Sequence, residues 1–245
     1  MQKHRELLLL AETSLYLAFY ADGIIMVKEI EKMRLNSYRC LIANLPFLRH
    51  ASTSRIETWQ NQVHPIPHCL AEIFGANPTV TFSRADLFWM AGATTVQKFV
   101  YGVILWGYPN GMRGNNFPNL VESMPLLVDL IGNIRNAGNQ IPVWDNHWEI
   151  AAEINGLGLV TYSKILYFIN ARANGNRCLI LDQVLIDVFA SQIFDEFNDL
   201  GNIAYENAPF SYPTYLGLME RESSRMGVTA DQLEMFLFMF GRVLK

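Results

Sequence analysis

The sequence predicts a mostly α-helical protein with, at most, a small β element near the N-terminus. Apolar residues recur at helical spacing along most of the chain, and runs typical of strands are few. Hydrophobic residues make up 51% and charged residues 17% of the 245 residues, so the chain can bury a sizeable core. No repeat occurs at the period of a solenoid, which argues against a repeat architecture.

The first 48 residues predict one long helix and a mixed segment. Residues 3–21 are rich in leucine and aromatic residues and are predicted to form a helix. Within them, Leu7–Ala21 is interpreted as a buried helix and not as a membrane span or signal, because Glu12 interrupts it and no small-residue cleavage site follows. Ile24–Val27 fits either a short strand or a helical turn, and Pro46 ends the run that follows.

Several further helices are expected between segments rich in proline and glycine. They lie near His68–Phe74 and over residues 84–106, 119–137 and 183–198, with a possible break at Gly92 and two final helices after Pro209. The last helix has the clearest local signals. Thr229 and Gln232 have the spacing of a capping box, and Gly241 can end the helix; its apolar face consists of Leu233, Phe236, Leu237 and Phe240.

Charge and cysteine content narrow the functional classes. The net charge of −4 argues against tight non-specific binding to duplex DNA, which usually needs a basic face, but leaves room for a local basic groove. The three cysteines (Cys40, Cys69 and Cys178) form no C-x-x-C or C-x-x-H pattern, so we expect neither a disulfide framework nor structural zinc, and a reducing cytoplasm fits best. We expect no metal or cofactor, because His64 and His68 are separated by two prolines and no nucleotide-binding loop is present.

The most informative stretch is residues 148–187, WEIAAEINGLGLVTYSKILYFINARANGNRCLILDQVLID. Two apolar helical runs flank the turn Gly156-Leu157-Gly158. Paired glycines permit backbone conformations closed to other residues, and the amides that begin the second helix can hold a phosphate. An ordinary packing corner between two helices is the alternative interpretation.

One lysine and one aspartate of this stretch are candidate catalytic residues. Lys164 lies among apolar neighbours, so its amine is expected to be partly desolvated and its pKa lowered, as a nucleophilic lysine requires. Asp182 follows 18 residues later and is placed to cap the next helix. Asp187, about one turn further on, is the reserve acid. The alternatives are a solvated helix lysine and a purely structural cap.

The stretch resembles the helix-hairpin-helix motif of DNA glycosylases. Its segments GLGLVTYSKILYF and LILDQVL are similar to those of bacterial proteins with an 8-oxoguanine DNA glycosylase fold. Trp106–Gly114 (WGYPNGMRG), Tyr212–Tyr215 and Ala230–Gly241 carry the same likeness, which extends over a little more than half of the chain. We therefore expect an N-terminal helical region, residues 1–82, whose role the resemblance does not indicate, and a glycosylase-like domain, residues 83–245; packing of the two regions as one unit is the alternative.

The resemblance implies a base-excision DNA glycosylase with lyase activity. An oxidised or modified guanine, 8-oxoguanine by implication, would be flipped into a pocket, where Lys164 attacks the sugar and Asp182 stabilises the positive charge. The nucleic-acid-binding hairpin would comprise Gly156, Leu157, Gly158 and Thr161. Candidates for the base pocket are Trp106, Tyr108, Arg113 and Phe238, although a turn whose aromatic residues seal the core is the alternative for the first three.

One position departs from the pattern of the superfamily. The catalytic lysine normally stands two residues after the second hairpin glycine, and here that residue is Val160; Lys164 lies one helical turn further along the same face. Either the lysine has moved by one turn, or the nucleophile is lost and Lys164 is structural.

The second case predicts a non-excising component of an anti-phage system. Similar proteins occur in operons of the type IV CBASS-like kind, so the partners would be a modified guanine, a nucleotide or other defence proteins. An all-helical scaffold without a ligand is a third possibility.

Overall fold

The chain folds mainly into helices, as the sequence predicts. The computed structural model describes residues 7–11, 14–21, 24–30 and 33–244, and side chains from residue 33 onward. The α-helices are α1 (Arg39–Ala43), α2 (Ile56–Gln60), α3 (His68–Phe74), α4 (Arg84–Ala93), α5 (Val96–Gly107), α6 (Asn116–Glu122), α7 (Met124–Asn136), α8 (Trp144–Ala152), α9 (Leu159–Phe168), α10 (Gln183–Ala190), α11 (Ala208–Met226) and α12 (Ala230–Phe240). Short 3-10 helices are η1 (Leu35–Tyr38), η2 (Phe47–Arg49) and η3 (Asp195–Leu200).

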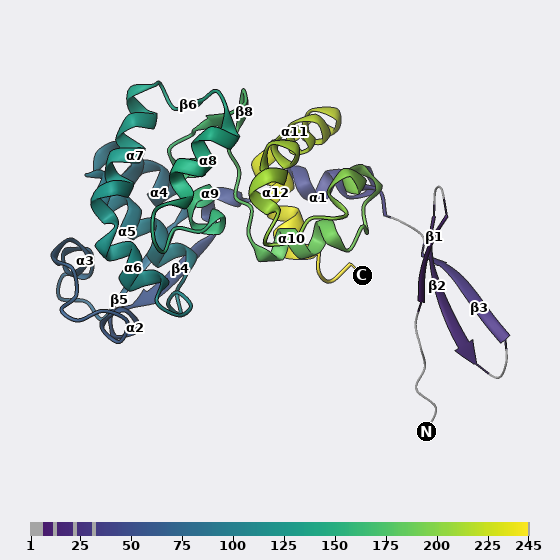
Figure 1. Ribbon diagram of the computed structural model, residues 1–245, viewed down its shortest axis with the longest axis horizontal. Coiled ribbons are helices and arrows are strands. Elements are labelled where there is room, and N and C mark those ends of the chain that lie inside the picture. Colours follow the sequence, from purple (N-terminus) through teal and green to yellow (C-terminus); the bar gives the residue numbers. More distant parts are fainter. Residues whose placement is uncertain (1–6, 12–13, 22–23, 31–32, 245) are drawn as a thin grey trace.

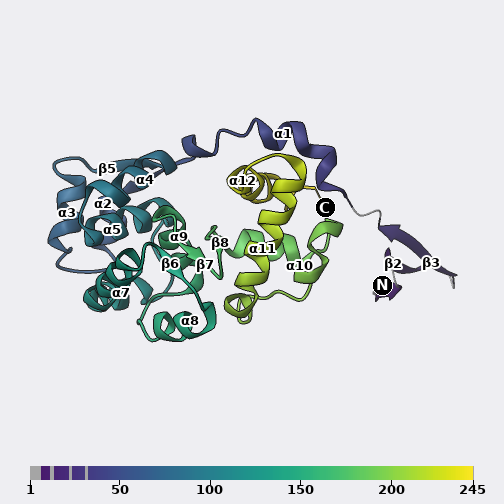
Figure 2. The same ribbon diagram turned by 90° about the horizontal axis from the view of Figure 1, so that it is seen from above.

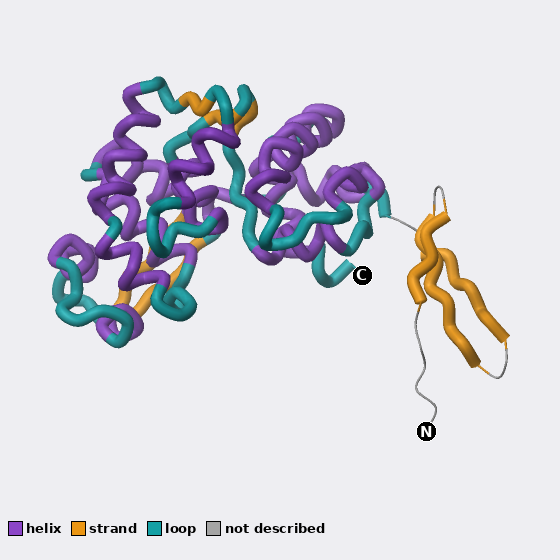
Figure 3. The backbone as a smooth tube through the Cα atoms, in the orientation of Figure 1, coloured by secondary structure: helices purple, strands orange, loops and turns teal. Residues whose placement is uncertain are grey.

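Three small sheets accompany the helices. The first is the antiparallel sheet β1 (Leu7–Ala11), β2 (Ser14–Ala21) and β3 (Ile24–Ile30), and the second is the antiparallel ribbon β4 (Ala51–Arg55) and β5 (Thr79–Ser83). In the third, β6 (Gln140–Ile141) pairs in parallel with β7 (Arg172–Ala173), which forms a hairpin with β8 (Asn176–Arg177). Figure 3 draws these strands in orange and the helices in purple.

The predicted helix over residues 3–21 is wrong within the described residues, where β1 and β2 form an antiparallel pair in which Leu7 lies opposite Ala18. Residues 3–6 and 12–13 of that prediction lie outside the described residues. A short apolar run fits a strand as well as a helix, and Asp22-Gly23, a dipeptide typical of hairpins, separates this run from β-branched Ile24 and Ile25. The expected N-terminal β element is therefore present, and it includes the strand alternative for Ile24–Val27.

Two helical lobes make up the main body (Figure 1). The first lobe contains α2 to α9 with β4 to β8, and the second contains α1, α10, α11 and α12 with η3. The chain starts this body in α1, crosses to the first lobe before β4, and returns between β8 and α10. Figure 2 shows that α1 lies beside α12, so segments from both ends of the chain build the second lobe.

Local signals explain where the helices near the site begin. Ser83 and Asp86 form a capping box at the start of α4, and Thr229 and Gln232 form the predicted one at the start of α12. The expected break inside residues 84–106 occurs at Thr94 and not at Gly92, because Thr95 caps α5. The helix expected over residues 183–198 already ends at Ala190.

The core is continuous from one lobe to the other and rich in aromatic side chains. Fully buried examples are Trp59, Phe117 and Trp144 in the first lobe and Tyr212 and Tyr215 in the second. Such rings bury large apolar areas, and the hydroxyls of the two tyrosines donate hydrogen bonds to the carbonyl oxygens of residues 179 and 180. These bonds fix the segment that leads into α10. Among the described residues, no helix is long and apolar enough to cross a membrane.

Candidate active site

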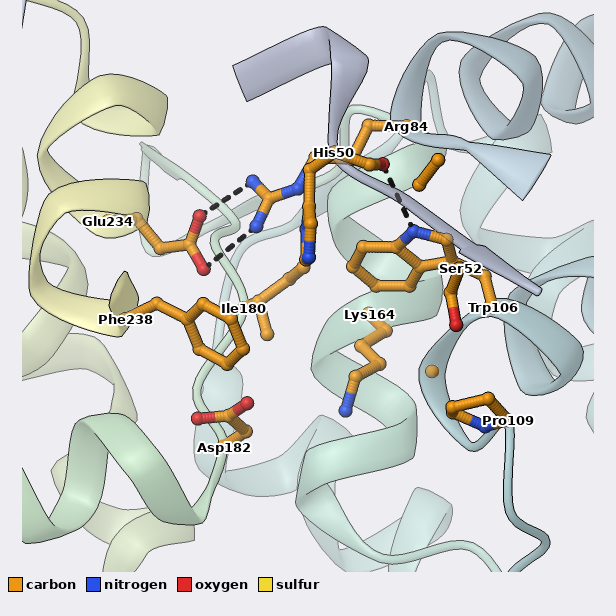
Figure 4. Close-up of a pocket in the computed structure, with 12 residues that line it drawn as sticks. His50, Ser52, Arg84, Trp106, Pro109, Lys164, Ile180, Asp182, Glu234 and Phe238 are labelled. Atoms are coloured by element: carbon orange, nitrogen blue, oxygen red, sulfur yellow. Dashed lines mark hydrogen bonds and ion pairs between the residues drawn. The ribbon is translucent and has the colours of Figure 1, made fainter. Parts of the chain in front are cut away.

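A pocket of about 220 Å³ lies between the two lobes (Figure 4). We call it the interlobe pocket. Its lining comes from the segment that enters the first lobe, from α4, α5 and α9, and from the segment before α10 and helix α12: His50, Ala51, Ser52, Arg84, Trp106, Gly107, Pro109, Lys164, Ile180, Asp182, Glu234 and Phe238. Residues 50–52 belong to the N-terminal region of the predicted division, so that region also contributes to the pocket.

A second pocket of about 480 Å³ shares part of this lining. We call it the hairpin pocket, because Gly156 and Gly158 of the helix-hairpin-helix turn border it together with Tyr108, Arg113 and Thr161. Both pockets are lined by Gly107, Lys164 and Asp182. The lysine and the aspartate that the sequence singled out therefore lie where the two pockets meet.

Lys164 lies on α9 and is only 5% exposed. Its ammonium nitrogen lies 4.9 Å from the ring centroid of Tyr108 and 3.4 Å from the carbonyl oxygen of Val160, one turn earlier in the helix. Burial lowers the pKa of Lys164 to about 8, although the negative charges of Asp182 and Glu234 oppose this shift. At neutral pH a small but useful fraction of the amine is therefore unprotonated.

Asp182 is the N-cap of α10. Its Oδ1 accepts hydrogen bonds from the backbone N–H groups of Val184 (3.0 Å) and Leu185 (3.1 Å), which confirms the predicted cap. The carboxylate also faces the interlobe pocket, on the side opposite the Lys164 side chain (Figure 4). Capping holds the carboxylate in a fixed orientation, so it can place a negative charge beside a bound ligand.

The reserve acid, Asp187, lies elsewhere. It is on the outer face of α10, where it accepts a hydrogen bond from Gln183 (2.8 Å) and forms an ion pair with Arg242. It lines neither pocket. Of the two predicted acids, only Asp182 lines the same pockets as Lys164.

A buried ion pair closes the end of the interlobe pocket that is far from the Lys164 amine. Arg84, at the first position of α4, donates to both carboxylate oxygens of Glu234 on α12 at 2.6 and 3.2 Å, and also donates to the hydroxyl of Tyr167 at 3.3 Å. Both charged side chains are only 1% exposed. Burial is the largest influence on Glu234 and raises its pKa, while the guanidinium of Arg84 opposes that shift. The pair joins the two lobes.

His50 lies next to this ion pair. Its ring lies 5.3 Å from that of Trp106 and 5.6 Å from that of Phe238, and its backbone carbonyl accepts hydrogen bonds from the backbone N–H of Arg84 and the indole N–H of Trp106. Burial and, secondarily, the charge of Arg84 lower the pKa of His50 to about 4. The imidazole is therefore neutral at pH 7.

The hairpin is packed tightly against α6. Gly156 has φ +83°, and a Cβ atom there would lie 2.3 Å from the carbonyl oxygen of Asn116. Leu157 is buried in the core, and Thr161 bonds to the hydroxyl of Tyr108 at 2.7 Å. Gly158 is the N-cap of α9. The hairpin is thus a packing corner between two helices, and its two glycines also border the hairpin pocket. Its role in binding nucleic acid stays a prediction.

The four candidates for a base pocket divide between the two cavities. Trp106 and Phe238 face the interlobe pocket from opposite sides (Figure 4), whereas Tyr108 and Arg113 line the hairpin pocket. Trp106 lies in the last turn of α5, which continues to Gly107. Its side chain is only 6% exposed, while that of Arg113 is exposed.

Three ionisable residues of the interlobe pocket were not among the candidates from the sequence: His50, Arg84 and Glu234. Glu234 interrupts an otherwise apolar stripe of α12, and a charged residue on such a stripe could have indicated a buried partner. Arg84 directly follows the cap of its helix and looks like a surface residue in the sequence. No local signal distinguishes His50.

Together, the fold and this site define a helix-hairpin-helix protein in which a buried lysine and a helix-capping aspartate meet at a cavity between two helical lobes. A family model described as "Putative 8-oxoguanine DNA glycosylase OGG-like protein" matches residues 46–238, and the chain belongs to this family. The match confirms the resemblance seen in the sequence and extends it upstream of Trp106 to include β4 and β5. No curated protein and no solved structure matches the chain.

Proposed function

We propose that this protein is a DNA glycosylase and lyase that removes an oxidised or modified guanine from DNA. The neutral amine of Lys164 would attack C1′ of the flipped nucleotide, and the electrons of the broken glycosidic bond would leave with the base, which takes up a proton. The attacking nitrogen would lose its proton to Asp182 or to water. Opening of the sugar ring would then give a Schiff base, from which the DNA strand can be cleaved.

The observation that carries this proposal is the position of Lys164 and Asp182 at the junction of two pockets of different size. The interlobe pocket, at about 220 Å³, is smaller than the roughly 300–1,000 Å³ typical of sites for drug-sized ligands and suits a single base. The hairpin pocket, at about 480 Å³, has room for a sugar and its phosphates. The glycosidic bond would cross the junction, next to both catalytic candidates.

The direction of the Lys164 side chain supports a nucleophile that has moved by one turn. Helical side chains lean toward the N-terminus of their helix, and the Lys164 amine accordingly lies 3.4 Å from the carbonyl oxygen of Val160. Val160 occupies the position at which the superfamily normally has its lysine. The longer reach of Lys164 thus brings an amine back to the same end of α9.

The surroundings of Lys164 make its amine more reactive than that of a lysine on the protein surface. A lysine in water is almost fully protonated at pH 7, whereas a pKa of about 8 leaves roughly a tenth of the amine neutral. Asp182 supplies a negative charge that would stabilise the cationic sugar of the transition state. Near the hairpin, the N-terminus of α9 and the exposed Arg113 provide a local positive potential for a phosphate, despite the net charge of −4.

Borohydride reduction tests this proposal, because it converts a Schiff base into a stable covalent adduct. Wild-type protein with DNA that contains one 8-oxoguanine should give the adduct, and Lys164→Gln should give none. Asp182→Asn keeps an oxygen for the cap and should slow the reaction. Lys98→Gln is the matched control, since Lys98 lines neither pocket. If wild type and Lys164→Gln behave alike, the lyase proposal fails.

A second candidate function follows from Val160. If the nucleophile has been lost, the same pockets would hold a modified guanine or a nucleotide without excision, and the protein would act as a recognition component alongside other anti-phage proteins. Binding of a modified base that raises the melting temperature, together with no adduct under borohydride, would favour this function.

A further inference from the structure

The interlobe pocket has polar atoms that the proposed reaction does not use. Arg84 commits its two terminal nitrogens to Glu234 and Tyr167, but its Nε is buried and makes no hydrogen bond. The Nδ1 atom of His50 is likewise buried and unpartnered. Both residues line the pocket. Buried polar atoms are nearly always paired, so two unpaired ones on residues that line the same cavity point to a ligand that completes them.

The arrangement of the pocket fixes which part of a purine these atoms would meet. Figure 4 shows Arg84 at one end of the pocket and the Lys164 amine and Asp182 carboxylate at the other. A nucleotide attacked at C1′ must have its N9 near Lys164. The six-membered ring of the base then extends toward Arg84 and His50, with Trp106 and Phe238 on either side.

We infer that Arg84 and His50 read the six-membered ring and select a 6-oxopurine, that is, a guanine- or hypoxanthine-type base, over an adenine-type base. This inference rests on the placement of the base in the proposed function. Arginine nitrogens can only donate, so Nε of Arg84 pairs with a carbonyl oxygen at position 6 and opposes an amino group there. The Nδ1 atom of His50 accepts from the neighbouring N1–H group.

The ion pair holds the Arg84 side chain in one orientation. The guanidinium is held by both oxygens of Glu234 and by contacts with the rings of Trp106 and Tyr167, whose centroids lie 5.5 and 5.4 Å from its central carbon. It therefore cannot turn to offer a different atom. His50 is neutral at pH 7, which allows one of its ring nitrogens to accept a hydrogen bond.

Binding to damaged DNA measures this selection without requiring excision. Three fluorescent single-stranded oligonucleotides would each carry one modified base (8-oxoguanine, 8-oxohypoxanthine or 8-oxoadenine), and an undamaged oligonucleotide gives the background. Wild-type protein should bind the first two with similar affinity and the third about 10- to 100-fold more weakly, because an opposed buried donor costs that much. Equal binding of all three would overturn the inference.

Variants separate hydrogen bonding from shape. His50→Phe keeps a ring in place and should reduce the preference. The double variant Arg84→Met with Glu234→Met should abolish it without leaving a buried unpaired charge. Phe238→Leu removes only stacking and should weaken all three complexes by a similar factor. If both His50→Phe and the double variant retain the full preference, or if Phe238→Leu abolishes it to the same degree, the inference is wrong.

The outcome is distinguishable from that of the proposed function. A preference for 6-oxopurines without a borohydride adduct would remove the enzymatic proposal and leave this inference intact. A borohydride adduct without a preference for 6-oxopurines would remove this inference and leave the enzymatic proposal intact.

Discussion

Gly107 leaves the space that the Lys164 side chain occupies. A Cβ atom built on Gly107 would lie 2.9 Å from Cδ of Lys164, a distance that real Cβ atoms essentially never show, and 3.1 Å from Cε, which is also unusually short. Gly107 is the last residue of α5, so its backbone does not itself require glycine. The Lys164 side chain, which packs directly against this position, explains why the residue is glycine.

Gly107→Ala should therefore impair the reaction more than it affects folding. The added methyl group would push the distal atoms of Lys164 aside, and a displacement of about 1 Å can slow catalysis roughly 100-fold. The rate of borohydride trapping measures this effect. Gly92→Ala on α4 is the control, because nothing lies within 4 Å of its added methyl group, and it should react at the wild-type rate. Equal trapping by both variants would show that Gly107 does not position the lysine.

The two glycines with φ +83° should respond differently to alanine. At Gly156 the methyl group would collide with backbone atoms, Asn116 O at 2.3 Å and the Leu120 nitrogen at 2.7 Å, whereas at Gly175 it would meet nothing within 4 Å. Both variants incur the cost of a left-handed backbone, about 1–2 kcal/mol, and Gly156→Ala has the collision in addition. Urea unfolding should show a loss of free energy of unfolding at least about 2 kcal/mol larger for Gly156→Ala. Similar losses would mean that the hairpin can move away from α6.

The ion pair between Arg84 and Glu234 should be costly to break and inexpensive to remove. Either Arg84→Met or Glu234→Met alone leaves a buried charge without a partner, which typically costs about 3–5 kcal/mol of folding free energy. The double variant replaces both charges with apolar groups of similar length and should lie within about 2 kcal/mol of wild type. Chemical unfolding of wild type, the two single variants and the double variant gives the coupling free energy between Arg84 and Glu234. Additive losses would show that the pair does not behave as a buried unit.

Much of this site could be predicted because its chemistry is local in the sequence. Lys164 and Asp182 are 18 residues apart, and an aspartate before an apolar helix is a recognisable cap. The pairing of Arg84 with Glu234 spans 150 residues and is formed only when the two lobes pack together. No helical period or local motif carries that information, and His50 likewise gains its role only from the lobe contact.

The N-terminal strands show the other limit of the sequence. The run Leu7–Ala21 contains enough leucine for a helix and enough aromatic residues for a strand, and periodicity does not separate the two in short apolar segments. The central strand β2 pairs with β1 on one side and with β3 on the other. The pairing between strands decided this outcome, whereas side-chain caps mark the starts of α4, α5, α10 and α12 in the sequence.

The reactivity of Lys164 should depend on pH in a defined direction. Its pKa is about 8, so below that value the amine is mostly protonated and unreactive, and above it the neutral amine predominates. Borohydride trapping on DNA with an abasic site, which needs no base excision, should accelerate up to about pH 8 and then level off. Asp182→Asn removes a charge that raises this pKa, so the midpoint should move to lower pH. A midpoint near 10.5 in the wild-type protein would place Lys164 in water.

Peptide mapping of the borohydride adduct tests the central claim most directly. The wild-type protein would be reduced on DNA that contains 8-oxoguanine, digested, and analysed by mass spectrometry to find the amine that carries the sugar. We predict one modified residue, Lys164, and no adduct in Lys164→Gln. An adduct on Lys98 or on the N-terminal amine, or no adduct on any amine, would contradict the account.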